Sequence, residues 1–285
     1  MSNLPAPKPE DRPRILERLR RMVRRWPQVS GYHLNPDDTI VEGIVQSLTR
    51  STMDHGVPYC PCRELTGDRT IDRANICPCD HHRAEIARDS FCRCVLFVGD
   101  DYTPEKAYSP IIDDEGLESI RSVRRRDVTV YSTSWCYMSR RALGLLKQRD
   151  VPSENIDIDR DEEAALRVEG WNNGTRSVPT IVVNLVLTEP RTRELESILL
   201  APKATVLNVD AHITSWCAQS RRTLAWLKDK GIEANVIDIE RDEAAAARVE
   251  AWNGGNRSVP TLAVSLLVTE PSNSELEQLL GLRVG

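Results

Sequence analysis

The sequence predicts an α/β protein of several domains, in which a cysteine-rich helical or α+β domain precedes two copies of a smaller α/β domain. Two observations support this prediction. Residues 60–94 hold six of the eight cysteines, arranged as three Cys-X-Cys pairs. Two later segments, each of roughly 75 residues, repeat one another without an insertion. The expected limits are 1–112 for the first domain, 113–126 for a charged linker, and 127–202 and 203–285 for the two copies.

The composition is that of a chain that buries hydrophobic cores. It has 285 residues, of which 40% are hydrophobic, and a net charge of −5. This mild acidity argues against nucleic acid as the main partner. No apolar run approaches the ~18 residues of a membrane span, and the first residues lack the apolar centre of a signal peptide. We therefore expect a cytoplasmic protein without a membrane partner, in which clustered cysteines bind metal or carry out redox chemistry.

Residues 12–26 predict an amphipathic helix, because its apolar residues recur at helical spacing. They are Ile15, Leu16, Leu19, Met22, Val23 and Trp26. The opposite face is basic. Two interpretations of this face stay open: a solvated surface, or a docking patch for an acidic protein. Its arginines are Arg12, Arg14, Arg18, Arg20, Arg21, Arg24 and Arg25.

A second helix is predicted to follow, ending at about Asp54. Asn35 is the expected N-cap, and Pro36 takes the first helical position. Gly56 and Pro58 provide the stop signal.

The two smaller domains are a tandem duplication. The stretch STSWCYMSRRALGLLK beginning at Ser132 returns as ITSWCAQSRRTLAWLK beginning at Ile213, and equivalent residues are 81 positions apart. Periodicity within a copy predicts the order strand, helix, strand, helix, strand, an optional strand, helix. In the first copy these elements are expected at 128–131, 139–147, 156–158, 161–171, 180–183 and 190–200.

The three cysteine pairs are Cys60/Cys62, Cys77/Cys79 and Cys92/Cys94, separated by 14 and 12 residues. The prolines inside the first two pairs keep the preceding cysteine extended, so that both sulfurs of a pair can face one side. Four thiolates complete a tetrahedral zinc site or a 4Fe-4S cluster, and two sulfurs then remain beside the metal. On the residues alone, zinc and iron–sulfur are equal alternatives, and a disulfide framework is the least favoured.

Three spaced Cys-X-Cys pairs with two central prolines resemble the catalytic subunit of ferredoxin:thioredoxin reductase. The likeness covers about residues 11–105 and includes NPDDTIVEGIVQSLTR before VPYCPCR, then NICPCD and FCRCVLFV. The resemblance implies a redox disulfide between Cys62 and Cys94, a ferredoxin-like electron donor, and a thioredoxin-like or other disulfide substrate. It also implies one 4Fe-4S cluster per chain, with the ligands Cys60, Cys77, Cys79 and Cys92.

The chain departs from this family between its last two cysteines, where plant-type members have a histidine. Arg93 stands there, and a guanidinium favours a thiolate but cannot carry a proton. His81 and His82 are candidates to replace the histidine. Adjacent histidines in a polar loop are, however, more often surface residues.

Each copy places one cysteine, Cys136 or Cys217, at the start of a helix. The helix N-terminus and nearby positive charge lower the pKa of such a thiol. A nucleophilic thiolate is therefore expected, and an inert buried cysteine is the alternative. The nearby arginines are Arg140, Arg141, Arg221 and Arg222.

The stretches TSWC, IDI and GNRSVPT resemble glutaredoxins, especially the mycoredoxin branch, over about 127–200 and 208–281. The resemblance implies a thioredoxin-like fold. It also makes Pro179 and Pro260 cis-prolines beside the active cysteine, where they help to bind the incoming thiol. Ser139 and Ser220 replace the second cysteine of the motif, so only the monothiol route remains, with glutathione or mycothiol as co-substrate.

Three functions fit these features. The favoured one is an iron–sulfur disulfide reductase in which Cys62 attacks a mixed disulfide held on Cys136 or Cys217, helped by a tether that raises the effective concentration to roughly millimolar. The second is a monothiol glutaredoxin-type iron–sulfur carrier. The third is a redox-inert interaction protein whose first domain is braced by zinc.

Overall fold

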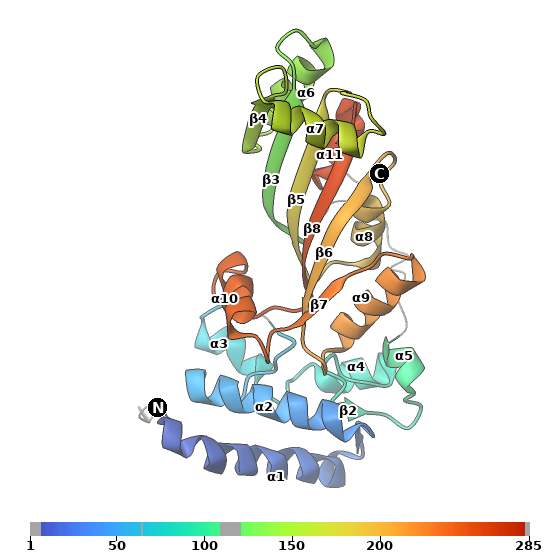
Figure 1. Ribbon diagram of the computed structural model, residues 1–285. Coiled ribbons are helices and arrows are strands. Elements are labelled where there is room, and N and C mark those ends of the chain that lie inside the picture. The colour runs from blue at the N-terminus through green and yellow to red at the C-terminus, as the bar shows by residue number, and fades with distance from the viewer. Residues whose placement is uncertain (1–6, 64, 109–120, 283–285) are drawn as a thin grey trace. The chain divides into compact units, whose positions relative to one another are not determined.

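The computed structural model describes residues 7–63, 65–108 and 121–282. It divides into two compact units (Figure 1). The first comprises residues 1–109 and 214–225, and the second comprises residues 110–213 and 226–285. Within the described ranges, no helix combines the length and the apolar character that a bilayer crossing requires.

Two long helices form the base of the first unit, α1 (Arg12–Ser30) and α2 (Asp38–His55). They pack along each other (Figure 1). Of the six apolar residues predicted to form its stripe, α1 buries Ile15, Leu19 and Val23. Leu16, Met22 and Trp26 are half-buried. On the polar side, the Arg20 guanidinium donates to the Glu42 carboxylate, with Nε 3.0 Å from Oε2. The basic face is thus partly anchored to α2 and otherwise solvated.

The start of α2 differs from the prediction. Asp37, not Asn35, is the N-cap, because its carboxylate accepts from the backbone N–H groups of Thr39 and Ile40. Asn35 is buried before the helix and has another role, described below. The predicted end is confirmed, since Gly56 closes the helix in the left-handed region with φ 80°.

The rest of the first unit consists of short elements joined by loops. The two-residue strands β1 (His33–Leu34) and β2 (Phe97–Val98) pair antiparallel. An isolated antiparallel bridge joins Tyr59 to Ile76. The remaining elements are η1 (Pro9–Asp11), α3 (Arg69–Asp72), η2 (Arg73–Asn75), α4 (His82–Asp89) and α5 (Pro104–Tyr108).

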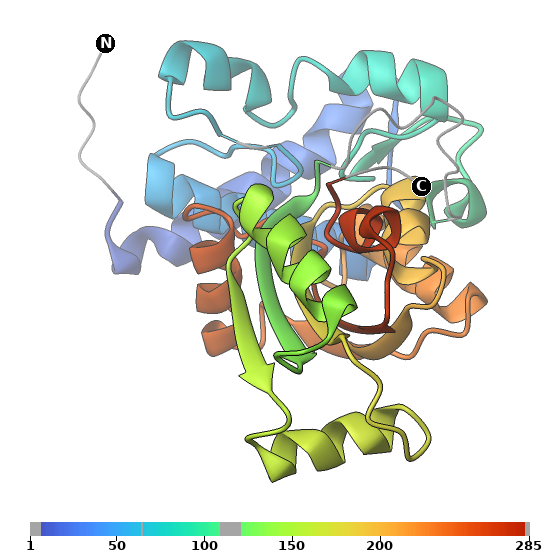
Figure 2. The ribbon, with the colours of Figure 1, turned by 90° about the horizontal axis from the view of Figure 1, so that it is seen from above.

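The second unit contains a six-stranded sheet in the order β4-β3-β5-β8-β6-β7 (Figure 1). The strands are β3 (Val123–Ser132), β4 (Ser153–Asp157), β5 (Thr180–Thr188), β6 (Thr205–Ile213), β7 (Asn235–Asp238) and β8 (Thr261–Thr269). The helices of the repeats are α6 (Tyr137–Gln148), α7 (Glu162–Trp171), α8 (Thr192–Leu199), α9 (Ala218–Asp229), α10 (Glu243–Trp252) and α11 (Asn273–Leu279). Figure 2 shows α8 and α11 side by side, where they contact each other.

Each repeat has the predicted order of strands and helices, with two differences in strand length. In the first repeat, β5 is one strand that continues to Thr188, so the optional further strand is not formed. β3 begins at Val123, inside the stretch expected as a linker, because its first residues pair with the end of β5. Residues 113–120 of that expected linker lie outside the described residues.

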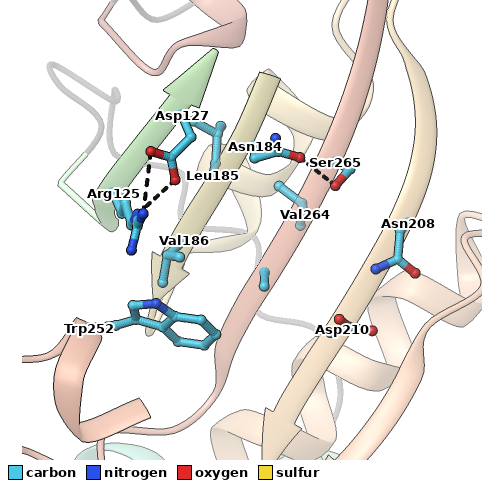
Figure 3. Close-up of a pocket in the computed structure, with 11 residues that line it drawn as sticks. Arg125, Asp127, Asn184, Leu185, Val186, Asn208, Asp210, Trp252, Val264 and Ser265 are labelled. Atoms are coloured by element: carbon cyan, nitrogen blue, oxygen red, sulfur yellow. Dashed lines mark hydrogen bonds and ion pairs between the residues drawn. The ribbon is translucent and has the colours of Figure 1, made fainter. Parts of the chain in front are cut away.

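The two repeats share one sheet because β5 pairs antiparallel with β8. Thr180 lies opposite Thr269, and Thr188 lies opposite Thr261. Since equivalent residues are 81 apart, this register is symmetric about a pseudo-two-fold axis between Asn184 and Ser265. There the Ser265 hydroxyl donates to Asn184 Oδ1 at 2.6 Å, within a shallow groove on the sheet (Figure 3). The pairing removes two edges that would otherwise be exposed.

Two asparagines brace this junction in the same way. Asn172 donates to the Thr180 hydroxyl at 3.0 Å and accepts from the Thr269 hydroxyl at 2.6 Å. Its equivalent, Asn253, makes the mirrored pair of bonds with Thr261 and Thr188. Each side-chain amide thus forms a hydrogen bond with one threonine of its own repeat and with one threonine of the other.

We expect Asn172→Ala and Asn253→Ala each to lower the free energy of unfolding by about 1–3 kcal/mol, because each removes two side-chain hydrogen bonds of the junction. The two losses should be similar, as the pseudo-symmetry requires. Urea unfolding followed by circular dichroism measures them. Asn208→Ala, at an exposed position of β6, is the control and should change stability by less than about 0.5 kcal/mol. A loss confined to one asparagine would contradict the symmetric account.

Candidate redox site

Backbone hydrogen bonds bring the three cysteine pairs together. The Cys60 N–H donates to the Asn75 carbonyl at 2.7 Å, and the Cys77 N–H donates to the Pro58 carbonyl at 2.9 Å. These bonds flank the Tyr59–Ile76 bridge and join the first pair to the second. The third pair lies in a turn closed by the Cys92 N–H, which donates to the carbonyl of Phe97 at 2.9 Å.

The sulfurs surround one small cavity. Its wall includes both members of the second and third pairs but only one member of the first, and Pro78, Leu96 and Phe97 make part of it apolar. Cys62 is not among the lining residues. The cysteines in the wall are Cys60, Cys77, Cys79, Cys92 and Cys94, all of which are buried.

The donor set fits a cluster bound by thiolates. Burial raises the pKa of Cys92 to about 12 and that of Cys77 well above its usual range. A hydrogen bond with Cys60, together with burial, also raises the pKa of Cys79. Thiols of this kind release their protons when they bind a metal. The Phe97 N–H points at the Cys92 sulfur at 3.4 Å, the kind of contact that tunes an iron–sulfur ligand.

The sulfurs are close to one another without enclosing a single ion. Sγ of Cys60 lies 2.9 Å from Sγ of Cys94. Among the residues that the structure describes, no three His, Cys, Asp or Glu side chains are grouped to hold one metal ion. Soft sulfur donors around an apolar cavity suit zinc or iron–sulfur.

Cys62 differs from the cysteines of the cavity wall. It is partly exposed, and its pKa is lowered to about 7. Hydrogen bonds with Cys60 and then Cys94 are the main causes, and the charge of Arg93 adds to them. A thiol with this pKa is substantially ionised near neutral pH, which makes it a nucleophile.

Glu85, on α4, joins the two loops that carry the expected redox thiols. One carboxylate oxygen accepts from the Arg63 guanidinium, next to Cys62, and the other accepts from the Arg93 backbone N–H at 2.9 Å, next to Cys94. Sequence reasoning missed Glu85 and Arg63, because an isolated acid in a charged helix gives no signal of a long-range partner.

Asn35 fixes the turn after Cys94. Its buried amide donates to the Val95 carbonyl at 2.8 Å and to the Tyr102 hydroxyl at 3.3 Å. Val95 adopts φ 58°, a region that β-branched residues rarely enter. Asn35 therefore helps to hold a strained backbone beside a candidate redox thiol.

The two candidate histidines differ in their surroundings. His81 is exposed, whereas His82 is buried and contributes to the cavity wall. The expectation of surface residues is thus wrong for His82. Its Nδ1–H donates to the Cys79 carbonyl, and Trp26 packs edge-on against its ring with centroids 5.6 Å apart. The backbone of Arg93 is tied to Glu85, and its side chain is exposed.

In the first repeat, Cys136 is the N-cap of α6. Its sulfur accepts from the Ser139 N–H at 3.5 Å and lies 3.5 Å from the Val178 carbonyl. Burial works against ionisation, but hydrogen bonds from Ser139 and from the Met138 N–H outweigh it and lower the pKa of Cys136. The thiol is partly exposed, as a nucleophile should be.

The predicted cis-prolines are confirmed in both repeats, at Pro179 and Pro260. Pro78 is also preceded by a cis bond, which was not predicted. The repeats brace each other here: the Pro179 carbonyl accepts from the Glu270 N–H, and the Pro260 carbonyl accepts from the Glu189 N–H, each at 2.8 Å.

In the second repeat, the Cys217 sulfur accepts from the Ser220 N–H at 3.4 Å, as Cys136 does from Ser139. Cys217, however, is buried. The arginines near the two cysteines are used in packing. Arg141 donates to the Pro271 carbonyl at 3.1 Å, and Arg222 donates to the Ala107 carbonyl.

Family models match most of the chain. The model described as ferredoxin thioredoxin reductase catalytic beta chain matches residues 9–119. The glutaredoxin model matches residues 128–187 and again residues 207–265. The two matches of the second model coincide with the two repeats.

Individual relatives give the same division. The ferredoxin-thioredoxin reductase catalytic chain of Cyanidium caldarium is 30% identical over 88 residues, which are 30% of this chain and 76% of that protein. A putative glutaredoxin of Mycobacterium tuberculosis is 40% identical over 68 residues, 23% of this chain and 81% of the relative. Mycoredoxin 1 of Corynebacterium glutamicum is 42% identical over 58 residues, 20% of this chain and 71% of the relative. The chain therefore belongs to the ferredoxin-thioredoxin reductase catalytic-chain family through its amino-terminal part and to the glutaredoxin family through its two repeats.

Proposed function

We propose that this chain is an iron–sulfur disulfide reductase that takes electrons singly from a ferredoxin-type donor and delivers them through its fused monothiol glutaredoxin domains. The observation that carries the proposal is the separation of the cysteines. Five line one buried cavity, whereas Cys62 lies outside it. Cys62 is a free thiol that is hydrogen-bonded to Cys94 and has a pKa lowered to about 7. This is the separation that a metal centre and an attacking thiol need.

In this proposal, Cys60, Cys77, Cys79 and Cys92 hold one 4Fe-4S cluster. When bound, the cluster supplies electrons one at a time to a disulfide whose reduction takes two. The basic face of α1 is a candidate contact for an acidic donor, because charge patches of this kind steer encounter. We place the protein in the cytoplasm, whose reducing conditions suit cysteines that bind metal or exchange disulfides rather than form structural ones.

Cys62 and Cys94 carry out the exchange. The Cys62 thiolate attacks a substrate disulfide, forms a mixed disulfide and releases one substrate thiolate. The Cys94 thiolate then attacks the Cys62 sulfur, which releases the second substrate thiol and leaves a Cys62–Cys94 disulfide. Two electrons and two protons restore the dithiol. Glu85 holds the two loops together during this cycle by accepting hydrogen bonds from both.

The substrate in this proposal is a mixed disulfide on Cys136 or Cys217, formed with glutathione, mycothiol or a protein thiol such as a thioredoxin-like one. Ser139 and Ser220 prevent either repeat from closing a disulfide within its own motif. A second thiol must therefore come from elsewhere, and the first domain has one.

Anaerobic turnover with reduced ferredoxin and the disulfides of glutathione and mycothiol tests the whole route. We expect the double substitution Cys136→Ser/Cys217→Ser to lower the rate at least about tenfold, because the tethered encounter is lost. Iron content should not change. Full activity in the double variant would refute the relay while leaving the reductase.

Iron analysis separates the roles of the first-domain cysteines. Cys62→Ser should retain about four irons and four sulfides per chain but lose disulfide reduction, because Cys62 lies outside the cavity. Cys79→Ser should lose most of the iron and the visible absorbance. Stoichiometric zinc in place of iron would support the zinc-braced alternative instead.

The Ser139→Ala substitution tests the tuning of Cys136. Removing the hydroxyl removes a side-chain interaction that favours the thiolate, so the pKa of Cys136 should rise toward its ordinary value and less thiolate should remain at neutral pH. The pH dependence of iodoacetamide alkylation, followed on the Cys136 peptide by mass spectrometry, measures the shift. Ser153→Ala, on exposed β4, is the control. An unchanged midpoint in Ser139→Ala would show that the backbone N–H groups suffice.

A further inference from the structure

The active-site segments of the two repeats are nearly identical in sequence but differ in environment. Residues 214–225 of the second repeat belong to the first compact unit, together with the cysteine-rich region. Trp216 is only 4% exposed, whereas its equivalent in the first repeat, Trp135, is 70% exposed. The tryptophan of this motif is thus buried in the second repeat and exposed in the first.

Gly43 of α2 provides the space for Trp216. A Cβ atom on Gly43 would lie 2.4 Å from Cδ1 and 2.9 Å from Cβ of Trp216. These contacts involve the base of the indole side chain, so the tryptophan could not avoid them by a small rotation of its far end. A glycine in the middle of a helix costs stability relative to alanine, and here it accommodates a tryptophan.

Ala218 makes the second contact. It is 2% exposed and packs in one apolar cluster with Phe91, Val95 and Ala107. The equivalent residue in the first repeat is Tyr137, which is 69% exposed. A tyrosine would not fit the site that Ala218 occupies, so the two repeats are not interchangeable here.

Two arginines complete the contact. The Arg222 guanidinium lies 5.3 Å from the centre of the Phe91 ring and donates to the Ala107 carbonyl. Arg221 lies 4.0 Å from the Asp37 carboxylate. The contact therefore combines apolar packing with a cation–π pair and an ion pair.

This contact places one thiol of the repeats beside the loop of Cys94. Cys217 lies between Trp216 and Ala218 in the sequence. Ala218 packs in the cluster that contains Val95, the residue after Cys94. Glu85 joins this loop to Arg63, the residue after Cys62. The covered motif thus lies beside the loops that carry the expected redox thiols.

We propose that Cys217 is the dedicated exchange partner of Cys62, and that Cys136 is kept for disulfides from outside the chain. This inference rests on the proposed reductase function and assigns its two repeats different roles. Trp216 and Ala218 act as positioning residues for the exchange. The open tryptophan and tyrosine beside Cys136 leave that thiol accessible to a low-molecular-weight or protein disulfide.

The proposed route consists of successive thiol–disulfide exchanges. A disulfide RSSR converts the accessible Cys136 thiol to a mixed disulfide and releases one RSH. The Cys217 thiol attacks the sulfur of the R group, so that RS moves to Cys217 and the freed Cys136 thiolate takes up the proton. The Cys62 thiolate attacks the Cys217 sulfur and forms a Cys62–Cys217 disulfide while the second RS⁻ leaves and takes up a proton. Cys94 then attacks the Cys62 sulfur and frees the Cys217 thiol.

Removing Cys94 should trap the Cys62–Cys217 disulfide. We would treat Cys94→Ser with glutathione disulfide under argon, block free thiols and map disulfides by mass spectrometry without reduction. We expect the Cys62–Cys217 linkage to exceed the Cys62–Cys136 linkage at least about tenfold, because the motif of Cys217 packs within the same compact unit as Cys62. Cys136 remains in the chain as an internal competitor.

Matched substitutions test whether the contact positions the thiol. In the Cys94→Ser background, Ala218→Tyr and Gly43→Ala should each lower the Cys62–Cys217 yield about tenfold, because each overfills the contact. Tyr137→Ala and Gly144→Ala make the related changes at the first repeat, where a Cβ on Gly144 meets open space, and should leave the yield unchanged. Iron content and circular dichroism of each variant report folding.

A second measurement uses the reduced chain with Cys94 intact. Iodoacetamide should alkylate Cys136 at least about tenfold faster than Cys217, since burial restricts access. Ala218→Tyr should remove most of this difference. Equal rates in the unsubstituted chain would overturn the inference.

The outcomes distinguish the inference from the function on which it rests. A dominant Cys62–Cys136 linkage, or equal linkage to both repeats, would overturn the assignment of Cys217 and leave the relay intact. Linkage of Cys62 to glutathione alone would overturn the assignment and the relay but leave a disulfide reductase. No disulfide at Cys62 would overturn the proposed function itself.

Discussion

The structure of the first domain depends on holding six sulfurs together with loops rather than with long helices or strands. Loop positions are set by a few long-range hydrogen bonds, and those bonds come from outside the cysteine motifs. Glu85 joins the first and third pairs, and Asn35 fixes the turn after Cys94. A neutral thiol can be buried at little cost, whereas a buried thiolate needs a positively charged partner such as a metal centre. The placement of these loops is therefore compatible with the metal centre proposed above.

The second unit depends on a different constraint, the symmetric pairing of β5 with β8. A repeat of this size would otherwise expose a strand edge. The duplication supplies a second strand with a matching edge, because β5 and β8 each have a threonine at both ends. The result is a sheet in which residues of one repeat brace the cis-proline of the other, as Glu270 does for Pro179. Each thiol site thus depends on both copies.

Features determined by local sequence could be predicted, whereas those determined by distant contacts could not. The helix containing Ile15 and Leu19 follows from its periodicity, and the two cis-prolines follow from the resemblance of their motif to glutaredoxins. Asn35 was predicted as an N-cap, because an Asn-Pro-Asp stretch offers two capping residues and only tertiary packing selects Asp37. Gly43 gave no signal at all, since the residue that needs its space lies more than 170 positions later in the chain.

The roles of the individual cysteines remain predictions, and physical context now distinguishes them more than their motifs do. Cys136 and Cys217 share the sequence TSWC and the same hydrogen bond from the serine three residues later. Cys136 is partly exposed and Cys217 is buried. The residue after Cys136 is the exposed Tyr137, whereas Ala218, the residue after Cys217, packs with Phe91 and Val95. A monothiol domain depends on a resolving thiol from elsewhere, so its neighbours decide what it can do. In this chain the packing around the motif, and not the motif itself, therefore distinguishes the two thiols.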